Sequence, residues 1–381
     1  MSKVLLGDVA VEHKETCKGS KDGYPIVGLE HLIPEEITLT AWDEGGENTF
    51  SKMFRKGNVL FGRRRAYLKK AAVAPFDGIC SGDITVIEAK PDRILPELLP
   101  FIIQNDDLFD FAVGKSAGSL SPRVKWEHLK NYEFELPDME KQKELAELLW
   151  AMDNTKKSYQ KLIAATDELV KSQFIEMFGD PMENPYDLMI HPLSEVSDIM
   201  SGITKGRKAK TDKLVRVPYL CTANVQNGFL DWTETKYIDA SDEEIRKYSL
   251  KRDDLLMIEG GDPDKVGRGY LAGTLPNNCI YQNHVFRVRI DKNQIYPEYL
   301  AAYILLPSIK EYFLSCAKQT TGIATINKKQ LSSMPVMYPE LDSQMRYIEF
   351  VRQSDKSKFE LEKALSELTA TYKRIIAENL G

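Results

Sequence analysis

Basic side chains are concentrated in a few short segments of this chain. Residues 54–70 carry seven cations and no acidic residue, and residues 203–216 carry six cations against Asp212 alone. Lys and Arg bind phosphate groups, and Arg also hydrogen-bonds to the edges of bases. One charged run is usually only a solvated surface, but several such runs in one chain favour contact with a nucleic acid.

Three further segments place cations among small or hydroxyl-bearing residues. EGGDPDKVGRGY from Glu259 is a glycine-rich loop after a strand-like run. GKSAGSLSPRVKWEHL from Gly114 and AKQTTGIATINKKQL from Ala317 each come before a long helical segment. Binding residues concentrate on loops that a rigid scaffold holds. These segments are therefore candidate parts of the same nucleic-acid interface.

One set of residues fits the spacing of a metal-dependent nuclease. Asp77, Glu88 and Lys90 follow the loose pattern in which carboxylates hold Mg²⁺ and a lysine positions a water. An internal repeat places Arg289 and Asp291 opposite Glu88 and Lys90, so the repeat speaks against a metal site. The nuclease remains a minor alternative.

Other catalytic patterns are incomplete. Asn184-Pro185-Tyr186 lacks the second proline of a methyltransferase motif and follows a helix stop, so it predicts a turn. The sequence contains no P-loop, and its five histidines lack the spacing of metal ligands. We therefore expect no catalytic residue and no metal site.

The longest helical pattern runs from Asp138 to Phe178 without Gly or Pro, and a second runs from Ser343 to Leu380. In both, apolar residues recur with the 3.5-residue period of a coiled-coil seam. The residues that we expect to pair the helices are Leu149, Tyr159, Ile163, Val170, Leu361, Leu365, Leu368 and Tyr372. The helices could lie antiparallel within one chain or pair between chains, and two ordinary core helices are the plainer alternative.

An internal repeat relates the two halves of the chain. PELLPFII from Pro96 matches PEYLAAYI from Pro297, and DITVIEAK from Asp83 matches HVFRVRIDK from His284. Each copy combines short β-branched runs with helices and continues into one long helix. The pattern predicts an α+β fold with a pseudo-two-fold repeat, in which two similar globular domains are separated by two long helices paired as an antiparallel coiled coil. The predicted domains are residues 1–138, a central helix 139–180, residues 181–340, and a C-terminal helix 341–381.

Composition is that of a globular protein of two or three domains. The 381 residues include 43% hydrophobic and 28% charged side chains, with a net charge of −6. The five cysteines are scattered singly, which is typical of a reducing cytoplasm. No apolar run is long enough to span a bilayer and no export signal is visible, so we expect a cytoplasmic protein without a membrane partner.

At this point the residues resemble a known family, the DNA specificity subunits of type I restriction-modification systems. The resemblance covers nearly the whole chain. It includes the opening GDVA, the segment KGNVLFGRRRAYLKKAAVA, the segment SPRVKWEHLKNYEFELPDMEKQKELAELL, and FIEMFGDP at the end of the central helix. These motifs are loose individually and specific in this order.

The resemblance implies a non-catalytic subunit of a methyltransferase and endonuclease complex. Each globular domain would be a target-recognition domain that reads one half of a bipartite target in double-stranded DNA. The helices would set the spacing and dock two modification subunits, to which restriction subunits add. No cofactor is expected on this chain, and S-adenosylmethionine, Mg²⁺ and ATP would belong to the partner subunits. A coiled-coil scaffold that binds only proteins is the runner-up interpretation.

Within the loops that match the family, we selected candidate DNA-binding residues. Small polar residues before a helix often cap it instead, so several are weaker candidates. The candidates are Arg63, Arg64, Arg65, Ser121, Arg123, Lys125, Lys205, Arg207, Lys208, Asp262, Lys265, Arg268, Thr320, Thr321 and Asn327.

Overall fold

The computed structural model describes residues 2–45, 48–118, 120–208, 213–226, 228–263, 265–320 and 322–381. The chain divides into two compact units, which we call unit 1 (Met1–Ile163 with Glu360–Gly381) and unit 2 (Ala164–Phe359). Each unit combines one β-rich domain with one part of each long helix. The predicted α+β class is confirmed, and the predicted domain boundaries stay a prediction.

Unit 1 contains two four-stranded sheets and one two-stranded sheet. Its strands are β1 (Ser2–Leu5), β2 (Ala10–Glu12), β3 (Pro25–Val27), β4 (Asp43–Glu44), β5 (Lys52–Phe54), β6 (Val59–Gly62), β7 (Ala71–Val73), β8 (Gly78–Cys80), β9 (Ile84–Ala89) and β10 (Glu133–Leu136). Its short helices are α1 (Leu6–Val9), the 3-10 helix η1 (Ala66–Leu68), α2 (Leu99–Ile103), α3 (Asp106–Gly114) and α4 (Trp126–Leu129). The strand orders are β2-β9-β6-β7, β4-β3-β8-β5 and β1-β10.

Unit 2 contains one four-stranded, two three-stranded and one two-stranded sheet. Its strands are β11 (Ile190–Pro192), β12 (Ser197–Ser201), β13 (Val215–Leu220), β14 (Lys236–Ala240), β15 (Leu255–Ile258), β16 (Gly260–Gly261), β17 (Gly269–Leu271), β18 (Ile280–Tyr281), β19 (Val285–Ile290), β20 (Lys318–Thr320), β21 (Ile323–Thr325) and β22 (Pro335–Met337). Its short helices are η2 (Leu193–Glu195), η3 (Thr222–Asn224), α6 (Asp242–Tyr248), α7 (Pro297–Tyr303), α8 (Pro307–Cys316) and α9 (Lys328–Ser332).

The same skeleton occurs in both units. The sheet β2-β9-β6-β7 of unit 1 has its counterpart in β12-β19-β15-β17 of unit 2, and the pair β1-β10 in β11-β22. Strand β3 runs parallel to β8, just as β13 runs parallel to β18. The strands β9 and β19 are the two runs that the sequence repeat aligned. The predicted internal repeat is therefore confirmed at the level of strand order.

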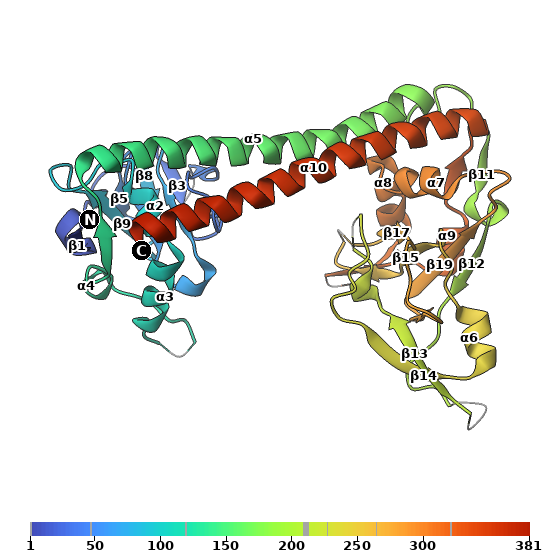
Figure 1. Ribbon diagram of the computed structural model, residues 1–381. Coiled ribbons are helices and arrows are strands. Elements are labelled where there is room, and N and C mark those ends of the chain that lie inside the picture. The colour runs from blue at the N-terminus through green and yellow to red at the C-terminus, as the bar shows by residue number, and fades with distance from the viewer. Residues whose placement is uncertain are drawn as a thin grey trace. The chain divides into compact units, whose positions relative to one another are not determined.

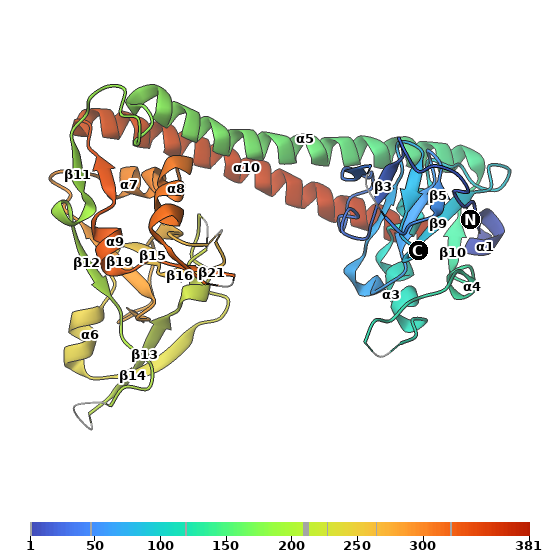
Figure 2. The same ribbon diagram turned by 180° about the vertical axis from the view of Figure 1, so that it is seen from behind.

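The two long helices are α5 (Met139–Phe178) and α10 (Leu341–Leu380), each of 40 residues. Gly179, with a φ of 78°, ends α5 in the left-handed conformation that glycine adopts without strain. Within each unit the two helices lie side by side (Figures 1 and 2). The first part of α5 shares unit 1 with the last part of α10, and unit 2 holds the other two parts. The helices therefore pair antiparallel within one chain.

Each end of a long helix is part of a domain core. In unit 1, Leu149 of α5 is fully buried in one cluster with Ile376 and Leu380 of α10. In unit 2, Phe174 of α5 and Tyr347 of α10 share another cluster. Of the remaining residues expected to pair the helices, Val170 and Tyr372 pack against the cores of units 2 and 1, and Tyr159, Ile163, Leu361, Leu365 and Leu368 are half-buried. In the described part of the chain, no helix combines the length and apolar character that a membrane crossing requires.

One buried glutamine near the start of each long helix, Gln142 in α5 and Gln344 in α10, forms hydrogen bonds between the helix and its domain. Each side-chain amide donates to the carbonyl oxygen of the proline five residues earlier, at 2.9 Å from Gln142 and 2.8 Å from Gln344. Each side-chain oxygen accepts a backbone N–H of the domain, from Leu95 at 2.8 Å and from Tyr296 at 2.9 Å. Because buried backbone groups need partners, these bonds fix the angle at which each helix leaves its domain.

We expect Gln142→Ala to destabilise unit 1 by about 2 kcal/mol, since it leaves a buried N–H and a buried carbonyl without their partners. Urea unfolding of the full chain measures the change. Gln353→Ala, which removes an exposed glutamine of α10, is the matched control and should shift stability by less than about 0.5 kcal/mol. Equal effects of the two substitutions would contradict the role of Gln142.

Candidate nucleic-acid interface

Two cationic loops of unit 1 are joined by backbone hydrogen bonds. We call residues 63–65 the arginine loop and residues 115–125 the second loop. The N–H of Val124 donates to the carbonyl of Arg63 at 3.0 Å, and the N–H of Arg65 donates to the carbonyl of Pro122 at 2.8 Å. The N–H of Arg63 in turn donates to the carbonyl of Asp83 at 3.0 Å. The loops therefore form one platform beside the first residue of β9.

The carboxylate of Asp83 holds two arginine side chains of this platform. Arg123 donates to it through Nε at 2.7 Å and through Nη2 at 3.2 Å, and Nη1 of Arg64 lies 3.4 Å away. Nε of Arg64 donates to Oγ of Ser121 at 2.5 Å. The hydrogen bond and charge of Arg123 hold the pKa of Asp83 below its usual range. One ionised carboxylate thus fixes the geometry of both loops.

The arginines of the platform keep part of their surface exposed. The side chains of Arg64 and Arg123 are 39% and 40% exposed although both contact Asp83. Arg65 is exposed and has a φ of 54°, a left-handed conformation uncommon for a residue with a side chain. Arg63 is half-buried, and Lys125 is exposed at the start of α4. The platform presents guanidinium groups that are already oriented, as phosphate or base contacts require.

In unit 2, Arg207 is engaged within the protein. Its Nε and Nη2 donate to the two carboxylate oxygens of Glu244 at 2.8 and 2.7 Å, and Nη2 also reaches the carbonyl of Asp239 at 3.1 Å. These donors lower the pKa of Glu244 to about 2. Lys205 and Lys208, on either side of Arg207, are exposed. The segment therefore offers two lysines to solvent around one arginine that braces the loop against α6.

The glycine-rich loop of unit 2 has its own ion pair. Lys265 contacts the carboxylate of Asp262, and this contact lowers the pKa of Asp262. Gly267 has a φ of 71°, and a Cβ there would lie 2.3 Å from the ring of Phe313. Only glycine fits at that point, so the chain turns closely over the core and leaves Arg268 half-buried beside it.

The last group of candidates lies near α9. Asn327 caps this helix: its Oδ1 accepts from the N–H of Gln330 at 3.0 Å, and Oε1 of Gln330 accepts from the N–H of Asn327 at 2.7 Å. This is a capping box, the plainer interpretation of that residue. Thr320 ends β20, and Thr321 lies outside the described residues.

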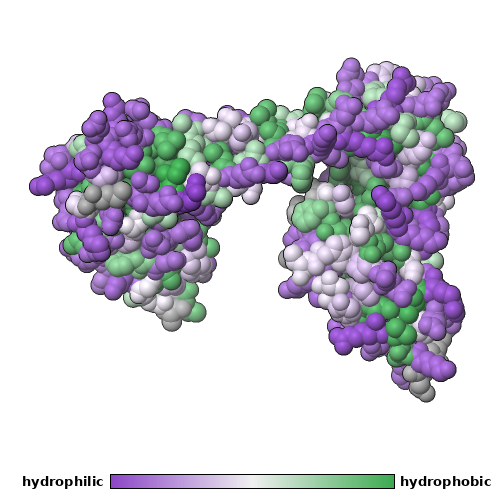
Figure 3. Space-filling model, viewed as in Figure 1, coloured by the Kyte–Doolittle hydropathy of each residue, from purple (hydrophilic) through white to green (hydrophobic). Residues whose placement is uncertain are grey.

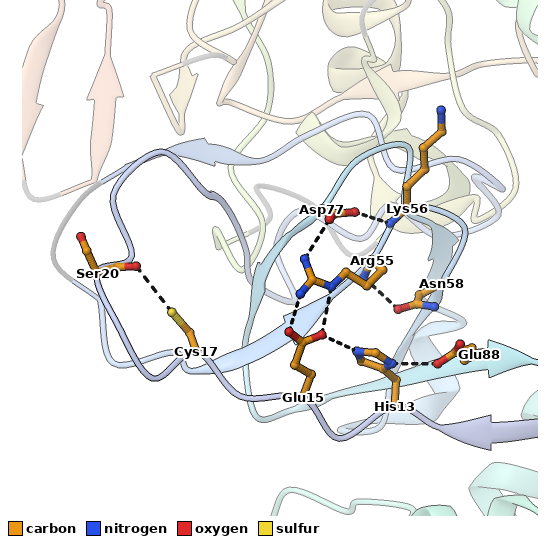
Figure 4. Close-up of polar contacts among 9 residues, drawn as sticks. All are labelled: His13, Glu15, Cys17, Ser20, Arg55, Lys56, Asn58, Asp77 and Glu88. Atoms are coloured by element: carbon orange, nitrogen blue, oxygen red, sulfur yellow. Dashed lines mark hydrogen bonds and ion pairs between the residues drawn. The ribbon is translucent and has the colours of Figure 1, made fainter.

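Two of the three residues of the nuclease alternative, Asp77 and Glu88, belong to a network of polar contacts (Figure 4). Asp77 accepts from Nη1 of Arg55 at 2.9 Å, and Glu88 lies 2.8 Å from Nδ1 of His13. Lys90 donates to the carbonyl of Gly7 at 2.7 Å. In the part of the chain that the structure describes, no group of His, Cys, Asp or Glu could hold a metal ion. The nuclease alternative gains no support from this geometry.

Sequence reasoning missed Asp83. It is a single acidic residue at the start of a strand, and its partner Arg123 lies 40 residues away. Charge patterning detects neighbours three or four residues apart on a helix, not pairs that the sheet brings together. The only signal was its position beside the repeated strand run.

The family follows from comparison of the whole sequence. It matches the family described as the type I restriction modification DNA specificity domain over residues 6–165 and again over residues 185–369. Because these matches cover most of the chain, the protein belongs to that family. The resemblance inferred from the motifs is thereby confirmed.

Three curated relatives are similar to part of the chain. The EcoKI specificity subunit of Escherichia coli K12 is 25% identical over 187 residues, 47% of this chain and 40% of the relative. The putative MjaX specificity subunit of Methanocaldococcus jannaschii is 25% identical over 163 residues, 42% of this chain and 38% of the relative. The EcoDI specificity subunit of Escherichia coli is 26% identical over 186 residues, 45% of this chain and 39% of the relative. The chain thus matches about two fifths of each relative's length.

Two solved structures share the fold. A chain from a study of complex assembly and conformational transition of the type I restriction-modification system matches with a TM-score of 0.59 and 20% identity, over 99% of this chain and 97% of that chain. The S subunit from M. genitalium matches with a TM-score of 0.54 and 14% identity, over 98% and 94%. The paired long helices between β-rich domains are therefore the architecture of this family.

We expect Asp83→Asn to loosen the platform, because the neutral amide holds two guanidinium groups less strongly than the carboxylate does. Amide hydrogen exchange of residues 117–124 should become faster. Asp92→Asn, at an exposed carboxylate paired only with the neighbouring Arg93, is the matched control. Unchanged exchange in the Asp83 variant would show that the backbone bonds alone hold the loops.

We expect the ion pair of Glu244 and Arg207 to stabilise unit 2 at neutral pH and to be lost in acid. The folded-state pKa of Glu244 is about 2, below its usual 4.5, so the stabilisation is present above pH 4.5 and lost as the pH falls toward 2. The free energy of unfolding should be larger for wild type than for Glu244→Gln at pH 6, and the two values should converge near pH 2. A difference that is independent of pH would contradict this pair as the cause.

Proposed function

We propose that this chain is the DNA sequence-specificity subunit of a type I restriction-modification enzyme. Each unit reads one half of a bipartite target in double-stranded DNA. The observation that carries the proposal is the double occurrence of one skeleton with cationic residues at corresponding places, Arg123 and Lys125 just before α4 in unit 1 and Lys328 and Lys329 at the start of α9 in unit 2. On this proposal these cations fix the register on phosphates, and the oriented arginines of unit 1 read base edges.

The long helices support a split target. A 40-residue helix is about 60 Å long, and one turn of DNA is about 34 Å. A spacer of this length suits two readers that contact separate parts of one duplex. On this proposal α5 and α10 set the gap between the half-sites.

The proposed partners follow from the repeat. Two equivalent stretches of helix offer two similar docking surfaces, which suits two copies of a modification subunit. Restriction subunits would complete the enzyme. The chain itself contributes no catalytic residue, and S-adenosylmethionine, Mg²⁺ and ATP would bind to the partner subunits.

The test is co-expression of this chain with a type I modification subunit encoded beside it, followed by co-purification and sequencing of methylated bases in the host DNA. We expect a complex and methylation at a split motif with two short half-sites and a fixed gap. A complex without methylation, or methylation at a continuous motif, would contradict the proposal. A chain that binds only proteins would favour the scaffold interpretation.

Within that complex we expect Arg64→Ala to weaken binding roughly tenfold on duplexes that contain the half-site read by unit 1, because an oriented donor is lost. Lys205→Ala is the corresponding change in unit 2, at an exposed lysine. Binding of each variant is measured on duplexes in which one half-site at a time is scrambled. The half-site whose presence is needed to see the loss of affinity shows which unit the substitution affects. Circular dichroism should show unchanged helix content, and equal losses on both half-sites would remove Arg64 from the interface.

A further inference from the structure

The second loop of unit 1 carries an unusually exposed apolar side chain. Leu120 is 90% exposed, more than any other large apolar residue in the described ranges. Apolar residues interrupt the mostly hydrophilic face of Figure 3 in small patches. A single exposed apolar residue needs no explanation by itself. The segment that precedes α9 in unit 2 supplies a second observation.

Unit 2 also presents an aliphatic residue in the segment before its short helix, although the equivalent bonds of Val124 to Arg63 and of Ile326 to Glu259 place it one residue from the position of Leu120. Ile323, the first residue of β21, is 49% exposed in the segment that precedes α9. Leu120 comes two residues after Gly118, which has a φ of 117°, and Ile323 comes directly after Gly322, which has a φ of 78°. The two segments differ in length and in most of their residues. They nevertheless share a glycine and an exposed aliphatic side chain.

Both segments are anchored in the same way. Val124 follows Leu120 and is 1% exposed in the core of unit 1, and Ile326 follows Ile323 and is 1% exposed in the core of unit 2. A short helix then begins in each unit, α4 or α9. The buried residue lies three or four positions further along the chain. It therefore restricts the backbone position from which the exposed side chain extends. The hydrogen bonds of the arginine platform hold the first of these segments further.

Exposed cations lie in or next to both segments. Arg65 and Lys125 are exposed beside the loop of Leu120, and Lys328 and Lys329 are exposed after Ile323. On DNA, cations contact phosphates, whereas apolar side chains can contact the base edges in the grooves. Thymine is the base that carries an apolar group, its 5-methyl, in the major groove.

We propose that Leu120 and Ile323 each contact the 5-methyl group of a thymine, one in each half-site, and so contribute to base specificity. This inference rests on the proposed DNA-reading function. It adds an apolar component of recognition that the cations do not provide.

The test replaces each thymine of the target in turn by deoxyuridine, which removes only the methyl group. The protein is the complex of this chain with its modification subunit, and the readout is the dissociation constant. We expect one substitution in each half-site to weaken wild-type binding about fourfold, the effect of one buried methyl group. Leu120→Ala should abolish the sensitivity at one of these thymines, and Ile323→Ala at the other.

The loss of sensitivity is the decisive result, because a merely structural role of Leu120 would weaken binding equally on thymine and deoxyuridine duplexes. Equal weakening on both duplexes, a half-site without thymine, or unchanged binding by Leu120→Ala would overturn the inference. If wild type binds its split target tightly and deoxyuridine leaves the dissociation constant unchanged, this inference alone is contradicted. Absence of any specific binding by wild type would instead contradict the proposed function.

Discussion

Burial of the two ends of each long helix in different cores is the constraint on which the rest of the structure depends. Leu149 of α5 joins Ile376 and Leu380 of α10 in unit 1, while Phe174 of α5 joins Tyr347 of α10 in unit 2. Neither core is complete without residues from both helices. Both α5 and α10 contribute residues to the two cores, so each long helix is shared by the two units.

The cationic loops show how an acidic chain presents a basic surface. The net charge is −6, yet acidic residues are used to hold particular arginines: Asp83 holds Arg64 and Arg123, and Glu244 holds Arg207. A guanidinium group that is already oriented loses less freedom on binding than a mobile side chain does. On the proposed function, such pairs would reduce the attraction for phosphate in general and favour contacts that match their geometry, which serves specificity more than affinity.

Much of this architecture was predictable from sequence, because long helical patterns and an internal repeat can be recognised without knowledge of tertiary contacts. The uninterrupted helical patterns predicted α5 and α10. The repeated strand runs predicted that β9 and β19 are equivalent strands of the two units. The partners of the candidate residues were not predictable. Arg123 pairs with Asp83 across 40 residues and Arg207 with Glu244 across 37, distances at which only the sheet arrangement decides which charges meet. The buried glutamines were also missed, since Gln142 and Gln344 look like ordinary polar positions of a helix.

On the proposed function, each unit reads its own half-site while the helices set the gap. The most direct measurement is the methylation motif of a chimera in which residues 185–340 are replaced by the corresponding segment of the EcoKI specificity subunit. We expect one half-site to change, whereas the other half-site and the length of the gap remain those of the original chain. A change in both half-sites, or in neither, would contradict it.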